Sequence, residues 1–176
     1  MKPLETSLGT IVIRQALIKD AESYRALRLE ALHQHPEVYS ADEKVNLERP
    51  KSFWEERVRS LGRDDMIMFA EHEQVLVGMC GIYLGESPKT RHSATIVGVY
   101  VKPEFRNLHI AGALIEICVD WARDQGARVV KLAVVTNDET AIHCYRRGRF
   151  EVYGTEPQAL FYSGIMYDEL LMARLV

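Results

Sequence analysis

Short apolar stretches alternate with longer amphipathic ones along the chain. Three consecutive stretches, residues 66–71, 75–84 and 93–101, have the length and β-branched content of strands, and His72 to Gln74 form a tight turn between the first two. We expect these three to form an antiparallel meander. Four further strands are predicted, and they cover residues 10–17, 129–135, 150–154 and 165–174, with an interruption or bulge at Asp168 and Glu169.

Helical spacing of apolar residues predicts the other elements. Helices are expected over residues 20–33, with Asp20 as the cap, and from Pro50 to about Leu61. Two more are expected from Ile110 to a stop at Gly126, and over residues 139–147. Residues 36–49 are polar and without periodicity, so they are predicted to be a mobile loop.

The order strand, helix, strand around residues 93–135 implies a right-handed crossover and a parallel pair. The predicted fold class is therefore mixed α/β, a mostly antiparallel sheet with one splayed parallel pair and helices on its faces. With 176 residues and 47% apolar content, the chain is expected to form a single domain over residues 1–176. Residues 1–9 are expected to be disordered or an irregular N-terminal extension.

Charge and cysteine content exclude several classes of function. The 22 basic and 25 acidic residues nearly balance, so we expect no nucleic-acid partner and no anionic membrane surface. Cys80, Cys118 and Cys144 are an odd number without a C-x-x-C spacing, which predicts reduced thiols and no metal site. Without a leader or a run of roughly 18 apolar residues, a cytoplasmic protein is expected.

The most informative segment is residues 99–114, where a strand enters a turn at Pro103 and then a helix rich in small residues. The first N–H groups of a helix lack intrahelical partners and attract phosphate. Small residues at Ala111, Gly112 and Ala113 let a ligand approach the backbone. Neither G-x-G-x-x-G nor G-x-x-x-x-G-K-[ST] occurs, which disfavours dinucleotide and nucleoside-triphosphate loops.

The spacing from Arg106 to Ala111 resembles [RQ]-x-x-G-x-[GA], the coenzyme-A pyrophosphate loop of the GNAT N-acetyltransferase superfamily, which follows a V-x-P turn as Val101 to Pro103 does. His109 stands where the family usually has glycine, and we expect it to adopt helical dihedrals with its imidazole in solvent or donating to a phosphate. The resemblance implies acetyl-CoA as cosubstrate. The residues it assigns to acetyl-CoA are Val99, Tyr100, Val101, Arg106, Asn107, Leu108, His109, Ile110, Ala111, Gly112 and Asn137.

Residues 136–150 resemble a second motif of that family, N-x-x-A-x-x-x-Y-x-x-x-G-F. Tyr145 falls on the tyrosine, whereas the glycine is displaced to Gly148, with Arg149 in its place. The asparagine is early by one position, so either Asn137 or Asp138 can occupy it.

Acetyl transfer needs polarisation of the thioester carbonyl and a proton for the departing sulfur. A bulge at Gly98 beside Val99 can expose backbone N–H groups for the first task. A phenol stays protonated at neutral pH, so Tyr145 is the candidate general acid, and the alternative is a core aromatic residue. Asn137 either bonds the pantetheine or caps a helix, and Arg106 either pairs with phosphate or is a solvated cation.

The base that deprotonates the amine is not evident from the sequence. Some relatives carry a glutamate where this chain has Ala133, and His92, Glu86 and His143 are reserve candidates. A nucleophile built from His143 and Cys144 is disfavoured, because adjacent helical side chains point about 100° apart.

The acceptor amine is expected to bind between the first two helices, residues 36–49 and residues 158–164. The acidic side chains available there to attract a cation are Glu37, Asp42, Glu43 and Glu48, and a solvated acidic loop is the alternative reading.

The predicted function is transfer of acetyl from acetyl-CoA to a primary amine of a small molecule or peptide by direct attack. One alternative is a non-catalytic acyl-CoA sensor or interaction module. Another is transfer to a hydroxyl group or of a longer acyl chain. A homodimer through an edge strand or the C-terminal hairpin is a candidate assembly.

Overall fold

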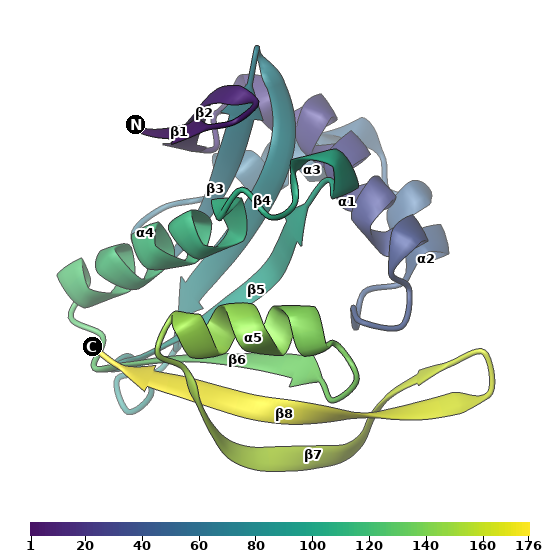
Figure 1. Cartoon of the computed structure of the whole chain (residues 1–176), viewed down its shortest axis with the longest axis vertical. Coiled ribbons are helices and arrows are strands. Elements are labelled where there is room, and N and C mark those ends of the chain that lie inside the picture. Colours follow the sequence, from purple (N-terminus) through teal and green to yellow (C-terminus); the bar gives the residue numbers. More distant parts are fainter.

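The computed structural model describes residues 1–176, and its central feature is one twisted sheet with helices on both faces (Figure 1). The strands are β1 (Lys2–Thr6), β2 (Gly9–Gln15), β3 (Asp65–His72), β4 (Val75–Leu84), β5 (Ser93–Val101), β6 (Val129–Val135), β7 (Glu151–Tyr162) and β8 (Ile165–Leu175). The helices are α1 (Ala21–Gln34), α2 (Glu43–Leu47), α3 (Lys51–Arg59), α4 (Ile110–Asp124) and α5 (Glu139–Arg147), with single 3₁₀ turns η1 (Ile18–Asp20) and η2 (Pro103–Phe105).

The strand order in the sheet is β1-β2-β3-β4-β5-β6-β8-β7. All neighbours are antiparallel except β5 and β6, which pair in parallel over Ser93–Thr95 and Val129–Lys131 only. Beyond these three residue pairs the two strands separate. The predicted mixed fold with one splayed parallel pair is therefore confirmed.

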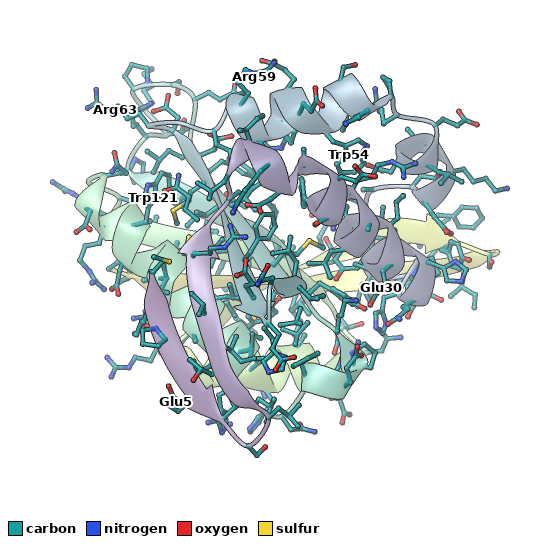
Figure 2. The ribbon with its side chains drawn as sticks, turned by 90° about the horizontal axis from the view of Figure 1, so that it is seen from above. Glu5, Glu30, Trp54, Arg59, Arg63 and Trp121 are labelled. Atoms are coloured by element: carbon teal, nitrogen blue, oxygen red, sulfur yellow. The ribbon has the colours of Figure 1, made fainter.

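Both faces of the central strands are covered, which explains why β3 and β4 are continuous apolar runs. Along β3, Met66 and Met68 belong to a core shared with α4 and α5, whereas Ile67 and Phe69 belong to a core shared with α1 and α3. In Figure 1, α4 and α5 lie in front of the sheet and α1 to α3 behind it. Figure 2 shows Trp54 of α3 beside α1, where its ring meets Tyr24 edge to face.

Two segments expected to be irregular have secondary structure. Residues 2–6 form β1, which pairs with β2 across a turn at Gly9 (φ +102°), so the expected irregular extension at residues 1–9 is wrong. Within residues 36–49, the Asp42 side chain accepts from the Val45 N–H at 2.9 Å and starts α2. The mobile-loop prediction is wrong there because this cap stabilises a helical turn that has no apolar periodicity.

Two further predictions differ in detail. Asp20 precedes α1, but its carboxylate accepts from Arg14 and from the Leu17 N–H, so it gives α1 no side-chain cap. The irregularity predicted at Asp168 and Glu169 of β8 lies instead in the neighbouring strand, β7. There, three residues of β7 lie opposite the single residue Asp168. Pro157 lacks an N–H for the ladder, and the next residue, Gln158, donates its N–H to the Asp168 carboxylate at 2.8 Å.

Candidate active site

A cavity of about 640 Å³ lies where β5 and β6 separate. Its walls come from residues 95–101 of β5, from β6, from Glu169 of β8, from α1 with the residues that follow it, and from α4 and α5. Its size is that of an ordinary small-molecule site.

The backbone of β5 faces this cavity through alternate residues. The Lys102 N–H bonds the Val77 carbonyl of β4, so the N–H and C=O groups of Val99 and Val101 point the other way, toward the opening. Both carbonyls already have donors. The Tyr39 hydroxyl donates to the Val99 carbonyl at 2.8 Å, and Arg106 Nε donates to the Val101 carbonyl at 3.2 Å. The N–H groups of Val99 and Val101 are what β5 offers a ligand.

Arg106 and Tyr39 are thus held by the protein itself. Arg106 Nη2 lies 2.9 Å from His35 Nε2, which ties the turn after β5 to the end of α1. Burial raises the pKa of Tyr39 to about 12, so its hydroxyl stays a donor. These contacts fix the shape of the cavity wall.

The bulge predicted beside Val99 is confirmed. Between the pairs Met79–Tyr100 and Gly81–Val97, β5 contains two residues, Gly98 and Val99, where β4 contains one. Gly98 has φ +61°, a left-handed conformation that favours glycine. A Cβ on Gly98 would lie 3.4 Å from Arg28 Nη1, an ordinary contact, so the backbone conformation and not a lack of space favours glycine here.

The start of α4 has the properties of an anion site. No side chain caps it and no acidic residue occupies its first turn, so its first N–H groups keep their partial positive charge. His109 at the cap position has φ 60° and ψ 15°, so the expected helical dihedrals are wrong. The left-handed conformation explains why glycine suits this position. His109 Nδ1 lies 3.4 Å from Arg147 Nη2, and a Cβ on Gly112 would meet no atom within 4 Å.

Tyr145 enters the cavity from α5. Asp138 caps this helix by accepting from the Ala141 N–H at 2.9 Å, which leaves the Asn137 side chain free to line the cavity. Tyr145 is 9% exposed and its ring contacts Phe150 edge to face. Burial raises the pKa of Tyr145 well above its ordinary value, and no side chain hydrogen-bonds its hydroxyl. The phenol is a protonated group that faces the cavity without a partner.

The predicted cofactor residues divide into two groups. Those that line the cavity are Val99, Tyr100, Val101, Arg106, Ala111 and Asn137, although the Tyr100 hydroxyl is turned away to bond Glu30 and Gln34. The others form the entry to α4 outside it, and they are Asn107, Leu108, His109, Ile110 and Gly112. Ile110 as a whole residue is only 1% exposed, so its side chain belongs to the core.

The reserve bases do not gather here. Glu86, His92 and His143 are exposed and lie outside the cavity, whereas Ala133 lines it. Of the four acidic residues considered for the amine, only Glu37 reaches its wall.

Sequence reasoning missed two charged cavity residues, Arg28 and Glu169. Arg28 follows Tyr24 by four residues and therefore lies on the same, inner face of α1. A cation on that face was the sequence signal that could have identified it. Glu169 lies in β8 directly across from Val135 of β6. Burial and the nearby Glu156 raise the pKa of Glu169. Nothing local in the sequence pointed to Glu169, because β8 reaches the cavity only through its pairing with β6.

No group of three or more His, Cys, Asp or Glu side chains is arranged to hold a metal ion. None of the helices combines the length and the apolar character required to cross a bilayer.

The model of the acetyltransferase (GNAT) family matches residues 26–149 of this chain. The L-amino acid N-acetyltransferase AaaT of Escherichia coli K12 is 28% identical over 173 residues, which cover 95% of this chain and 99% of that protein. A GNAT-family acetyltransferase from Streptococcus pneumoniae superposes with a TM-score of 0.84 at 22% identity, covering 94% of this chain and 99% of that one. A phosphinothricin acetyltransferase from Sinorhizobium meliloti, solved with acetyl-CoA, gives 0.82 at 20% identity, covering 94% and 88%.

Proposed function

The chain belongs to the acetyltransferase (GNAT) family, and from this premise we propose that it moves the acetyl group of acetyl-CoA to the primary amine of a small molecule by direct attack. The observation that carries the proposal is the single cavity that brings the β5 bulge, Asn137 and the unpartnered Tyr145 hydroxyl together beside the start of α4.

Acetyl-CoA fits the groups present. The uncapped first turn of α4, with Arg147 nearby and no acidic residue, suits a diphosphate. From there the pantetheine arm would follow β5, bonding the N–H groups of Val99 and Val101 much as an added strand does. Asn137 is available to bond the arm from the other wall. When bound, acetyl-CoA supplies the reactive thioester.

Two steps are assigned to residues of this chain. Backbone N–H groups at the Gly98–Val99 bulge would stabilise the negative charge that develops on the thioester oxygen. Tyr145 would give its proton to the departing sulfur, a role that suits a phenol whose pKa keeps it protonated at neutral pH. No covalent enzyme intermediate is required.

The acceptor is proposed to be a small amine rather than a peptide. Support comes from AaaT, which is named for L-amino acids and matches nearly the whole chain. The cytoplasm is proposed as its compartment. The proposed assembly is a pair of copies joined through β7, one of the two edge strands, whose Tyr153 is 58% exposed.

The test is release of free thiol from acetyl-CoA with a panel of L-amino acids, polyamines, aminoglycosides and peptide N-termini. Turnover with a small amine supports the proposal, and turnover with peptides alone overturns the choice of acceptor. A protein that acetyl-CoA stabilises against heat but that releases no thiol across the panel is a sensor. Light scattering of the purified protein tests the dimer.

A further inference from the structure

Arg28 is the one arginine of the cavity whose guanidinium has neither a hydrogen bond nor an ion pair within the protein. Its Nη1 is sealed from solvent and has no hydrogen-bond acceptor, and no carboxylate lies within ion-pair distance. Arg106, by comparison, is held by Val101 and His35. Arg28 is half-buried, and the nitrogen that it keeps from water lacks an acceptor, which costs free energy and points to a ligand that supplies an anion there.

The position of Arg28 is fixed from two sides. Its guanidinium lies 4.8 Å from the centre of the Tyr39 ring, and Tyr39 is itself anchored on the Val99 carbonyl. On the other side, Nη1 lies against Gly98 of the bulge. The cation is therefore preorganised beside the peptide groups proposed to hold the thioester oxygen.

Glu169 enters the same cavity from the other strand. Its cross-strand partner is Val135, and residues paired in this way place their side chains on one face of the sheet. Ala133 lies on that face, two residues earlier in β6, and is exposed to the cavity. A glutamate from β8 can reach diagonally over the small alanine, so a carboxylate stands close to the position where the sequence motif lacked one.

We propose that the acceptor is an amine that also carries a carboxylate, as an α-amino acid does, with Arg28 holding the carboxylate and Glu169 removing the proton of the ammonium group. This inference rests on the proposed acetyl transfer and names its substrate class. Arg28 beside β5 and Glu169 beside β6 match the two charges of a zwitterion, and an amine without a carboxylate would leave Arg28 without an anion.

The proton balance is complete. The ammonium group gives one proton to Glu169, and the neutral nitrogen attacks the carbonyl carbon. The C–N bond forms and the C–S bond breaks. Tyr145 protonates the sulfur, the nitrogen gives its extra proton back toward the phenolate, and Glu169 returns its proton to solvent. The products are an N-acetyl amino acid and free coenzyme A.

The experiment compares matched acceptors, each L-amino acid against its carboxamide and its decarboxylated amine. The wild type is expected to prefer the free acids by at least ten-fold in kcat/KM. Arg28→Met should raise KM for the acids ten- to hundred-fold and remove the preference, with KM for acetyl-CoA unchanged. Arg25→Met is the control on the same helix, since Arg25 lies outside the cavity and donates to the Leu47 carbonyl.

If the wild type uses acids and amides equally well, this inference is overturned and acetyl transfer is left intact. The same holds if Arg28→Met weakens the use of the free acid and of its carboxamide equally. Where no acceptor is turned over, the proposed function fails. In that case the substrate class is tested by measuring how far each candidate acceptor raises the melting temperature of the protein in the presence of free coenzyme A. Stabilisation by amino acids and not by their amides supports the Arg28 site, and its absence contradicts it.

Discussion

Asn107 and His109 both have left-handed backbones, with φ 63° and 60°, in the loop that enters α4. Such a conformation costs a residue with a Cβ roughly 1 kcal/mol, and His and Asn tolerate it better than β-branched residues do. The motif could be recognised from spacing alone, but the left-handed φ of His109, at the motif's glycine position, was not predicted from the sequence. The histidine is accommodated because its ring lies outside the core.

His109→Val is expected to lower the free energy of unfolding by at least about 1 kcal/mol, because a β-branched residue suits the left-handed region poorly. His109→Gly is expected to be neutral or slightly stabilising. Urea denaturation measures both. His143→Val, in the exposed face of α5, is the control, with a cost of a few tenths of a kcal/mol. Equal stability of the two valine variants would contradict the strain at His109.

Tyr145→Phe is expected to lower kcat about ten- to thousand-fold with little change in the affinity for acetyl-CoA, because only the proton donor is lost. Steady-state kinetics and calorimetry provide the two readouts. Tyr153→Phe, on the exposed surface of β7, serves as the control. Unchanged turnover in Tyr145→Phe would remove this residue from the role of acid.

Glu169 gives a pH signature. Because the pKa of Glu169 is raised, its carboxylate becomes protonated at a higher pH than usual and can then no longer act as a base. We therefore expect kcat/KM to fall as pH falls through that pKa. Glu156 of β7 directly faces it, and the β6 partner, Val135, is uncharged. The other charged or titratable groups of the cavity are Arg28, His35, Glu37, Tyr39, Tyr100, Arg106, Asp138, Cys144 and Tyr145.

Glu156→Gln removes a negative neighbour, so it should lower the pKa of Glu169 and move the acidic limb of the profile to lower pH at nearly full maximal rate. Glu169→Gln should lower kcat by about two to four powers of ten and abolish that limb. An acidic limb that is identical in wild type and Glu169→Gln would assign it to the amine substrate instead.

At the scale of elements, the sequence predicted the bounds of a strand or helix correctly where its apolar pattern and its end signals were strong. The bounds of β4, β5, β6 and α5 match the sequence prediction, because apolar runs or helical periodicity end there at turn residues or caps. β1 and α2 were missed because each has five residues and few apolar positions. The outer half of β7 was missed because Pro157 and polar neighbours are typical of loops, yet an edge strand tolerates them.

The cap of α5 connects stability to the site. Asp138→Ala removes the acceptor for the Ala141 N–H and is expected to cost about 1 kcal/mol of unfolding free energy. Because Tyr145 lies on this short helix, kcat should also fall. Serine can also cap a helix, so Asp138→Ser should keep most of the stability and most of the activity. Urea denaturation measures the first and turnover the second. Full activity in Asp138→Ala would show that Tyr145 is positioned without this cap.

At the scale of the whole molecule, the cavity depends on segments far apart in sequence. Arg28 precedes most of the sheet and Glu169 lies near the C-terminus, and only the pairing of β8 with β6 brings the second to the site. The cofactor end was predictable because its groups lie in two continuous motifs. The acceptor end was not, because its groups meet only through tertiary packing.

The buried ion cluster that joins β2, η1 and β3 should dominate acid sensitivity. Arg14 bonds both Asp20 and Glu71. Burial alone would raise the pKa of Asp20, but the hydrogen bonds from Arg14 and from the Leu17 N–H outweigh it and lower the pKa. The stabilising effect of the Asp20 carboxylate is therefore complete above its ordinary pKa and is lost as pH falls through the depressed value.

Asp20→Asn is expected to cost about 3 kcal/mol of unfolding free energy at neutral pH, because it breaks a buried pair on one side. The difference from wild type should shrink as pH falls below about 4. Denaturation at several pH values measures it. The control is Asp120→Asn, whose exposed pair with Arg123 is expected to contribute less than about 1 kcal/mol. A difference that does not change with pH would contradict the linkage.

The most direct measurement is mass spectrometry of an amino acid panel after incubation with acetyl-CoA that carries an isotope-labelled acetyl group. We predict one labelled acetyl group on the amine nitrogen of the accepted substrate for each free thiol released, and about ten- to thousand-fold slower appearance of both signals in Tyr145→Phe. Binding of acetyl-CoA without labelled product on any acceptor would contradict the transferase account.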